Sequence, residues 1–406
     1  MTPAALRAAL AAAFARGLGA VDLGARVAAS MPRVPRGARA GVVVAVGKAA
    51  PAMAQGALAA AGAWCARVLV VAPDGTEARF DDARVEVMRA AHPDPDGRSV
   101  AAARRAVAVV READFVVALV SGGASSLVCL PAGLTLAGYV RVVGALRLAG
   151  APVRDVNVVR RHLCAVKGGG LARAAGGPVH TRVASDVLGG AAYDVGSGPT
   201  VADPTTQADA RAVLARYVPA LRVPALHESL KPGAAAARGL RARVVARPEE
   251  LARTVARELA AAFDDVRVLR PTEATAAALA REYTARAAAL RPGQAVVRAA
   301  EPSLAVAGAR AGRGGRSTHL AAMVASGLPP GVAFLAAASD GVDGTSGTGG
   351  AAVDASLLRR AGAEAVARAV GTFDTGPLLV AAAMALPLRP SGTNLADVHV
   401  LARARP

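Results

Sequence analysis

Residues 114–131 read Asp-Phe-Val-Val-Ala-Leu-Val-Ser-Gly-Gly-Ala-Ser-Ser-Leu-Val-Cys-Leu-Pro, and this stretch decides the expected fold. An unbroken apolar run rich in β-branched residues that ends at a glycine pair is typical of a strand buried on both faces of a parallel sheet. The run is Phe115 to Val120, so residues 121–126 would follow the carboxyl end of that strand. Open α/β sheets bind their ligands at this edge, because backbone N–H groups point into the crevice there.

The loop at 121–126 has the composition of a phosphate-binding turn. Gly122 and Gly123 let the main chain approach a ligand and take positive φ. Ser121 and Ser125 offer hydroxyls to anionic oxygens. The alternative is a strand-to-helix turn that needs glycine for its geometry alone, since the loop is neither a Walker A sequence nor a spaced Gly-x-Gly-x-x-Gly fingerprint.

The surrounding chain predicts a parallel sheet of βαβ units. Residues 41–46 and 68–72 have the pattern of strands, and residues 49–61 between them have that of a helix. Right-handed crossovers place the turns at 47 and 121 along one edge of this sheet. Further strands are expected at 243–246, 266–269, 304–307, 332–338 and 398–401.

The length and the linker composition predict two domains. A chain of 406 residues exceeds one ordinary core, and residues 225–245 are rich in Pro, Ala, Gly and Arg. We expect one α/β domain over residues 1–238 and a second, smaller one over residues 239–406.

The charge of the chain favours small anionic ligands over nucleic acid. The formal net charge is +18, but the positive residues are spread singly and aromatic residues make up only 3%. Lysine occurs only at positions 48, 167 and 231, so the other 45 basic residues are arginine, as GC-rich coding would produce. We therefore expect no nucleic-acid partner.

The sequence also predicts a cytoplasmic protein without a membrane segment. The apolar stretch 378–388 is far shorter than the roughly 20 residues that span a bilayer. The N-terminus lacks the apolar block and cleavage site of a secretory signal. Cysteines at 65, 129 and 164 contain no Cys-x-x-Cys pair, which indicates neither a disulfide framework nor a zinc site.

Several polar residues could support phosphate chemistry. Lys48 and Lys167 each stand beside glycine, where a compact ammonium fits a tight phosphate site. Asn157 and Arg160 add donors on a helix that could equally be a solvated basic face. His92, in a proline-rich turn, is interpreted as a structural turn histidine, with ligand contact as the alternative.

Two carboxylates are expected at strand ends. Asp186 follows a short apolar strand, and Asp340 follows the run 332–338. Such carboxylates can hold Mg²⁺ or accept a hydroxyl proton, although capping a helix is the plainer role. Phosphoryl transfer needs well-positioned reactants, cationic side chains that neutralise the migrating phosphoryl group, and Mg²⁺.

Taken together, the motifs resemble those of glycerate 2-kinases of the MOFRL-domain type, in order along essentially the whole chain. The matching segments are Val46-Gly-Lys-Ala-Ala50, His92-Pro-Asp-Pro-Asp96, Ser121-Gly-Gly-Ala-Ser-Ser126, 157–169, Ser185-Asp-Val-Leu-Gly189, Ser197-Gly-Pro-Thr200, Gly312-Arg-Gly-Gly-Arg316, Ser339-Asp-Gly-Val-Asp-Gly344 and Ser391-Gly-Thr-Asn394.

The resemblance implies an ATP-dependent kinase that phosphorylates D-glycerate at its 2-hydroxyl. It implies a Rossmann-like N-terminal domain with a parallel sheet, a smaller α/β C-terminal (MOFRL) domain and an active site between them. A homodimer remains open.

The resemblance also implies roles for individual residues. The essential cations would be Lys48 and Arg316, and Asp186 would orient or deprotonate the substrate hydroxyl. Asp340 would hold Mg²⁺, although the two aspartates could exchange roles. Nucleotide or substrate oxygens would be bound by Ser121, Gly122, Gly123, Ser125, Asn157, Arg160 and Lys167.

The chain departs from the family pattern at three loops. Gly190 stands where the family usually has Asp, Ser317-Thr-His319 replaces Asn-Gln-Glu, and Ser346-Gly-Thr-Gly-Gly350 replaces Thr-Asp-Ala-Ala-Gly. A kinase of another small hydroxy acid, or a catalytically weakened ligand-binding member, is therefore an alternative. A hydroxypyruvate reductase is a further alternative, although the dinucleotide fingerprint is missing.

Overall fold

The computed structural model describes residues 1–223, 226–304, 306 and 311–405. The chain forms two compact units. The N-terminal unit is Leu23–Ala246, and the C-terminal unit joins Met1–Asp22 to Arg247–Pro406. The predicted division at 238/239 is corrected at two points: the boundary lies at 246/247, and the first 22 residues fold with the C-terminal part.

The N-terminal unit is a parallel α/β sheet, as expected. Its strands are β1 (Gly41–Val46), β2 (Cys65–Pro73), β3 (Val85–Ala90), β4 (Phe115–Ser121), β5 (Val179–Ala184) and β6 (Arg241–Ala246). Its helices are α2 (Leu23–Ala29), α3 (Ala50–Ala60), α4 (Gly97–Arg111), α5 (Ala124–Leu127), α6 (Leu136–Leu148), α7 (Val153–His162), α8 (Gly170–Arg173) and α9 (Gln207–Tyr217), with short 3₁₀ turns η1 (Val195–Ser197) and η2 (Ala235–Ala237).

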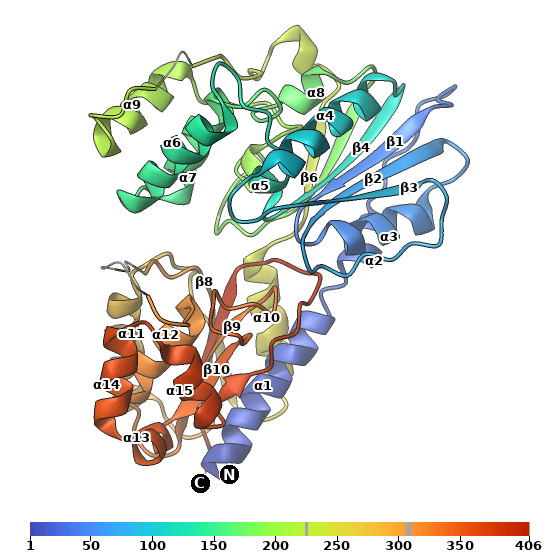
Figure 1. Cartoon of the computed structure of the whole chain (residues 1–406). Helices are drawn as coiled ribbons and strands as arrows, with labels where there is room; N and C mark the ends of the chain where they lie inside the picture. Colours follow the sequence, from blue (N-terminus) through green and yellow to red (C-terminus); the bar gives the residue numbers. More distant parts are fainter. Residues whose placement is uncertain (224–225, 305, 307–310, 406) are drawn as a thin grey trace. The chain divides into compact units, whose positions relative to one another are not determined.

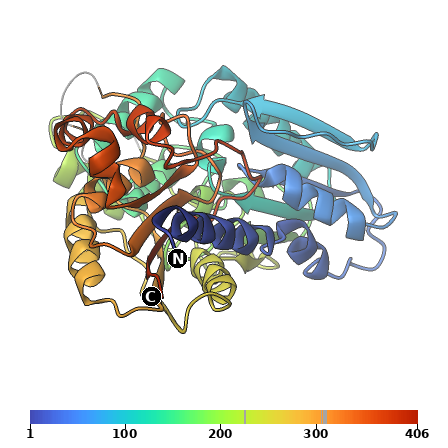
Figure 2. The same ribbon diagram turned by 90° about the horizontal axis from the view of Figure 1, so that it is seen from below.

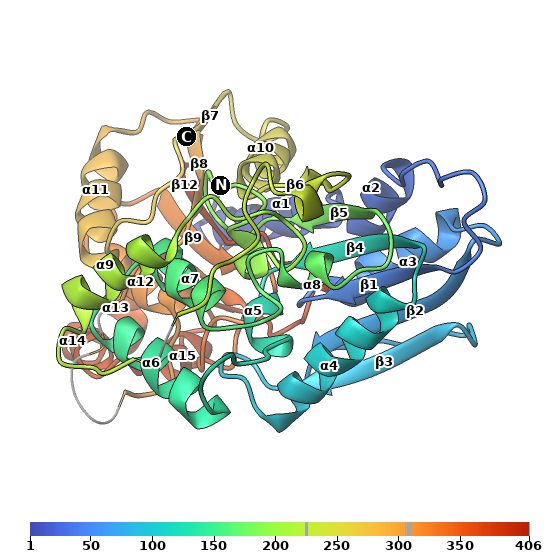
Figure 3. The same cartoon turned by 90° about the horizontal axis from the view of Figure 1, so that it is seen from above.

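The strand order β3-β2-β1-β4-β5-β6 makes β1 and β4 direct neighbours. Val46 pairs with Val120, so both strands end at the same level. Every residue of β1 and β4 is buried, which confirms the reading of residues 41–46 and 115–120. Helices α2 and α3 cover one face of the sheet and α4 covers the other (Figure 1 and Figure 3).

The C-terminal unit is built on a mixed sheet. Its strands are β7 (Asp265–Val268), β8 (Gln294–Ala300), β9 (Val332–Ala338), β10 (Gly350–Asp354), β11 (Ala385–Leu386) and β12 (Asp397–Arg403), in the order β11-β10-β9-β12-β8-β7. Its helices are α1 (Pro3–Gly19), α10 (Pro248–Leu259), α11 (Ala276–Ala289), α12 (Arg316–Ala325), α13 (Ser356–Ala361), α14 (Ala363–Gly371) and α15 (Thr375–Ala381).

The strands expected at 332–338 and 398–401 are confirmed as β9 and as part of β12. The strand expected at 304–307 is not confirmed: Leu304 and Val306 lie in no strand, and residues 305 and 307 fall outside the described residues. The sheet instead uses β8, which the sequence pattern did not predict.

Helix α1 belongs to the core of the C-terminal unit. It packs against α10, β9 and β10 with Leu6, Leu10 and Phe14 buried (Figure 2). Arg7 forms an ion pair with Asp354 at the end of β10. Residues 3–29 are long and apolar enough to cross a membrane by length and composition. In the structure they are instead divided into α1 and α2, which pack in different units.

Candidate functional site

The carboxyl ends of β1 and β4 lie side by side where the chain order of the sheet reverses. Strands β2 and β3 extend to one side of β1, and β4 begins the other side. Such a switch point is the usual ligand-binding position of an open α/β sheet. The Lys48 N–H donates to the Gly122 carbonyl oxygen at 2.9 Å, and the Ala49 N–H donates to Ser121 Oγ at 3.1 Å. The predicted meeting of the turns at 47 and 121 is thus confirmed.

Glycine is required at two positions of this edge. Gly47 has φ +131°, and a Cβ atom there would lie 2.1 Å from Ser121 Oγ. Gly123 has φ +87°, and a Cβ atom there would lie 3.3 Å from Lys48 Cγ and 3.2 Å from His92 Cδ2. Both glycines therefore allow a close approach of groups as well as a left-handed backbone.

A chain of hydrogen bonds connects the glycine-serine loop to α7. Ser125 Oγ lies 2.7 Å from Ser197 Oγ, and Ser197 donates to Asn157 Oδ1 at 2.9 Å. Arg160 Nη1 donates to the same amide oxygen at 3.2 Å. Asn157 Nδ2 in turn donates to the Asp194 carbonyl oxygen at 2.9 Å. The structure thus brings together Ser125, Asn157 and Arg160, which the sequence placed in one site.

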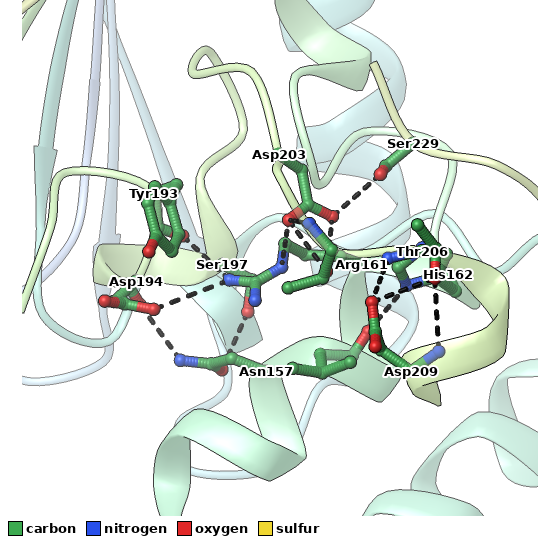
Figure 4. Close-up of polar contacts among 12 residues, drawn as sticks. Asn157, Arg161, His162, Tyr193, Asp194, Ser197, Asp203, Thr206, Asp209 and Ser229 are labelled. Atoms are coloured by element: carbon green, nitrogen blue, oxygen red, sulfur yellow. Dashed lines mark hydrogen bonds and ion pairs between the residues drawn. The ribbon is translucent and has the colours of Figure 1, made fainter. Parts of the chain in front are cut away.

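A buried ion pair supports this chain of contacts (Figure 4). The Arg161 side chain is 1% exposed and lies between the carboxylates of Asp203, at 3.1 Å, and Asp194, at 3.7 Å. A paired and fully enclosed guanidinium acts as a fixed part of the fold. The sequence pattern does not reveal the partners of Arg161, which follow 33 and 42 residues later in irregular segments.

Lys167 takes a position inside the fold, where the sequence interpretation expected a ligand-facing one. The residue is 2% exposed. Its Nζ donates to the Val128 carbonyl oxygen at 2.8 Å and to Cys164 Sγ at 3.4 Å. The ammonium also lies 5.7 Å from the centre of the Tyr139 ring. These contacts hold the chain after α5 against the chain after α7, so Lys167 stabilises the loops behind the site.

Asp186 lies at the same edge of the sheet as the glycine-serine loop. Ser121 pairs with Ala184, the last residue of β5, and Asp186 follows two residues later. Asp186 is half-buried. A hydrogen bond across Asp186 holds this segment: the Val187 N–H donates to Ser185 Oγ at 3.2 Å.

Arg316 and Asp340 lie in the C-terminal unit, apart in sequence from the other predicted residues. Arg316 is the first residue of α12 and its side chain is 41% exposed. Its guanidinium lies 2.8 Å from Glu301 and 3.7 Å from Asp397. Burial alone would lower the pKa of Arg316, but Asp397 and Glu301 outweigh this effect and raise it. The arginine is therefore a permanent cation held by two carboxylates.

The acidic groups near Arg316 are unusually desolvated. Burial raises the pKa of Asp397 to about 7, against the opposing effect of Arg316. Burial also raises the pKa of Asp343, although its carboxylate accepts from the N–H groups of Ser317, at 2.9 Å, and Thr318, at 2.8 Å. The Asp343 carboxylate therefore caps the N-terminus of α12.

Asp340 is the carboxylate that the sequence analysis assigns to a metal ion. Within the described ranges, no group of three or more His, Cys, Asp or Glu side chains is arranged to hold a metal. Mg²⁺ usually takes one or two carboxylates together with water and substrate phosphates. Asp340, whose Oδ1 accepts from the Val342 N–H at 3.0 Å, can supply one such oxygen.

The fold and these loops define the class of the protein: a two-unit α/β protein with glycine-rich loops at the ligand-binding edge of its parallel sheet. Residues 9–230 match the family described as "Domain of unknown function (DUF4147)", and residues 294–397 match the MOFRL family. A protein of Agrobacterium vitis that is provisionally named a hydroxypyruvate reductase is 34% identical over 399 residues, covering 92% of this chain and 89% of that protein.

Two further comparisons point to glycerate kinases. The D-glycerate 2-kinase of Thermotoga maritima is 40% identical over 182 residues, or 43% of each chain. The crystal structure of the Thermotoga maritima glycerate kinase superposes with a TM-score of 0.82 at 27% identity, covering 98% of this chain and 99% of that one. The chain belongs to the glycerate 2-kinase family, of the type that carries a MOFRL domain.

Proposed function

We propose that this protein transfers the γ-phosphoryl group of ATP to the 2-hydroxyl of D-glycerate and so forms 2-phosphoglycerate. The observation that carries the proposal is the meeting of the Lys48 turn and the glycine-serine loop at the switch point of the parallel sheet. A lysine beside glycine-rich backbone at this position suits the oxygens of a phosphate tail. Membership of the glycerate 2-kinase family supports the choice of substrate.

Phosphoryl transfer depends on positioning and on neutralising the charge of the migrating group. We assign Lys48, Ser121 and the backbone of Gly122 and Gly123 to the phosphate oxygens. Ser125 and the Asn157–Arg160 pair would orient nucleotide or substrate oxygens through the hydrogen bonds that join them. These residues act mainly by fixing geometry.

The remaining roles fall to two aspartates and one arginine. Asp186, at the edge of the same sheet, would accept the proton of the substrate hydroxyl. Arg316 would stabilise the charge on the migrating phosphoryl group, as permanent cations do in other phosphotransferases. Mg²⁺ bound with ATP would lower the negative charge of the phosphates, and Asp340 would hold it.

The proposal defines the partners as a nucleotide and a small hydroxylated acid. Nucleic-acid binding is not expected, because the positive residues are spread singly along the chain. A cytoplasmic location and the lack of a membrane partner stay predictions, and so does a homodimer, which size-exclusion chromatography with light scattering would test.

The test is ADP release that depends on D-glycerate, coupled through pyruvate kinase and lactate dehydrogenase. Adding enolase to a separate reaction identifies the product, because enolase consumes 2-phosphoglycerate directly. Lys48→Met should lower kcat/KM at least 100-fold, since a positioned cation on phosphate is worth several kcal/mol. Lys231→Met is the matched control, because Lys231 is paired with Glu228 at 2.6 Å. No ADP release above background with D-glycerate would refute the proposal.

Further assays on the same purified protein distinguish the alternative functions. Phosphorylation of a different hydroxy acid would identify another small-acid kinase. Thermal stabilisation by nucleotide without any turnover would identify a ligand-binding member. A hydroxypyruvate reductase would oxidise NADH in the presence of hydroxypyruvate. This assay is needed because one relative is provisionally named for that reaction. The turn after β1, Gly47-Lys48-Ala49, argues against it because it lacks the dinucleotide-binding fingerprint.

A further inference from the structure

The connection between β3 and α4, residues 91–96, reaches across the sheet to the glycine-serine loop. Strands β2 and β1 separate β3 from β4 in the sheet. Nevertheless, a Cβ atom on Gly123 would lie 3.2 Å from His92 Cδ2 and 3.4 Å from His92 Nε2. The same point lies 3.3 Å from Lys48 Cγ. The loops after β1, β3 and β4 therefore converge on one spot, and the imidazole is part of it.

Three contacts fix the part of this loop that follows His92. Ser126, which follows Gly123 by three residues, donates its hydroxyl to the Pro93 carbonyl oxygen. Arg147 on α6 forms an ion pair with Asp94. Asp96 then caps α4, accepting from the Ser99 N–H at 3.2 Å. The backbone beside His92 is therefore tied to α4, α5 and α6, which positions the residue at the edge of the sheet.

The chemistry at the spot suits a phosphate group. His92 is exposed and Lys48 is half-buried, so both side chains can be reached by a ligand. Imidazole N–H and ammonium groups both donate to phosphate oxygens. Gly123 has no side chain to crowd either residue, and its positive φ excludes most other residues.

We propose that His92 is a ligand-binding residue that donates to a phosphate oxygen of the nucleotide beside Lys48. This inference rests on the proposed phosphotransferase function, since it assigns the phosphate to ATP. It changes the interpretation of the histidine from a turn residue to part of the site.

Binding can be tested without turnover. The sequence has six histidines, so the imidazole signals in a proton–carbon NMR spectrum can be assigned by substitution. The signal that disappears in His92→Gln should shift in the wild-type protein when ADP or pyrophosphate is added, and should stay in place when sodium chloride is added to the same ionic strength. A His92 signal that does not move at saturating ADP overturns the proposal.

Kinetics give a second, independent test. His92→Gln and His92→Ala should raise KM for ATP roughly 10- to 100-fold, the equivalent of one hydrogen bond to a charged group. KM for D-glycerate should change much less. The matched control is His180→Gln, because His180 lies near the amino end of β5, with its ring 5.3 Å from that of Phe115. An unchanged KM for ATP in both His92 variants would also overturn the proposal.

The two tests separate this inference from the proposed function. If D-glycerate is not phosphorylated but the His92 signal moves with ADP, the kinase proposal fails and the binding role of His92 stands. If D-glycerate is phosphorylated while the signal stays fixed and KM is unchanged, the role of His92 fails alone.

Discussion

Asp397 should make the C-terminal unit less stable as the pH rises from about 4 to 7. Its side chain is 5% exposed, and burial raises its pKa from 3.8 to about 7. Below pH 4 the carboxyl is protonated in both the folded and the unfolded chain, so it has no effect. Above that pH the unfolded chain loses the proton first, and unfolding becomes more favourable until the folded group also ionises near pH 7. A shift of about three pH units corresponds to about 4 kcal/mol in total.

The substitution that isolates this effect is Asp397→Asn, which keeps the size of the side chain and removes its titration. Between pH 5 and pH 8 the wild-type unit should lose about 3 kcal/mol relative to the variant. The measurement is hydrogen exchange of the β9 and β12 amides in urea, because the single tryptophan, Trp64, lies in the other unit. Asp264→Asn, at a carboxyl that is 65% exposed, serves as the control. Stability differences that are equal at both pH values would refute the reasoning.

Three other substitutions test the packing described above. Arg7→Met should destabilise the C-terminal unit by about 3–5 kcal/mol, since Asp354 is 4% exposed and would lose its cation; the same exchange experiment measures this, and a loss below about 1 kcal/mol would contradict it. Gly123→Ala should lower kcat/KM roughly 100-fold in the ADP-release assay, because the new methyl group displaces its neighbours; wild-type kinetics would count against the site. Lys167→Met should cost about 1–3 kcal/mol in urea unfolding, because the Val128 carbonyl loses its donor, and should leave KM for ATP unchanged; a large rise in KM would instead restore a binding role.

Three fully buried strands could be predicted because they consist almost entirely of apolar residues. Strands β1, β4 and β9 are buried at every position, so their sequence has no competing interpretation. Strand β8 escaped prediction because Arg298 interrupts it. That guanidinium is neutralised by Glu282 at 2.8 Å and lies over the Tyr283 ring, and neither partner can be identified from the strand itself.

The position of the N-terminus could not be predicted for a similar reason. Residues 3–19 form a helix rich in alanine, and the sequence does not say which surface it covers. The surface to which the helix packs is fixed by the ion pair of Arg7 with Asp354, which are 347 residues apart in sequence. The helix also approaches α10 closely, since a Cβ atom on Gly17 would lie 2.7 Å from Val255 Cγ2.

The candidate site was predictable where it depends on strand ends and not where it depends on loops that cross the sheet. The turns after β1 and β4 followed from the βαβ order. The place of His92 did not, because a loop can leave the end of β3 in any direction. The enclosure of Lys167 was equally hidden, since a lysine beside three glycines has the same sequence whether it faces a ligand or a carbonyl oxygen.

The loops that depart from the family pattern differ in conformation as well as in charge. A Cβ atom on Gly190 would lie 2.7 Å from Val187 Cγ1, so an aspartate there would require a different loop conformation. In the C-terminal unit, Ser346 Oγ lies 2.9 Å from Thr348 Oγ1, and Gly347 between them stands where the family usually has Asp.

The altered residues at the start of α12 make new contacts of their own. Thr318 accepts from the Gly315 N–H at 3.0 Å and so completes the start of α12, while His319 stacks on Phe373 with ring centres 5.0 Å apart. Burial lowers the pKa of His319, which keeps it neutral. At 317–319 the chain therefore replaces the carboxylate that the family usually carries with a neutral, stacked imidazole.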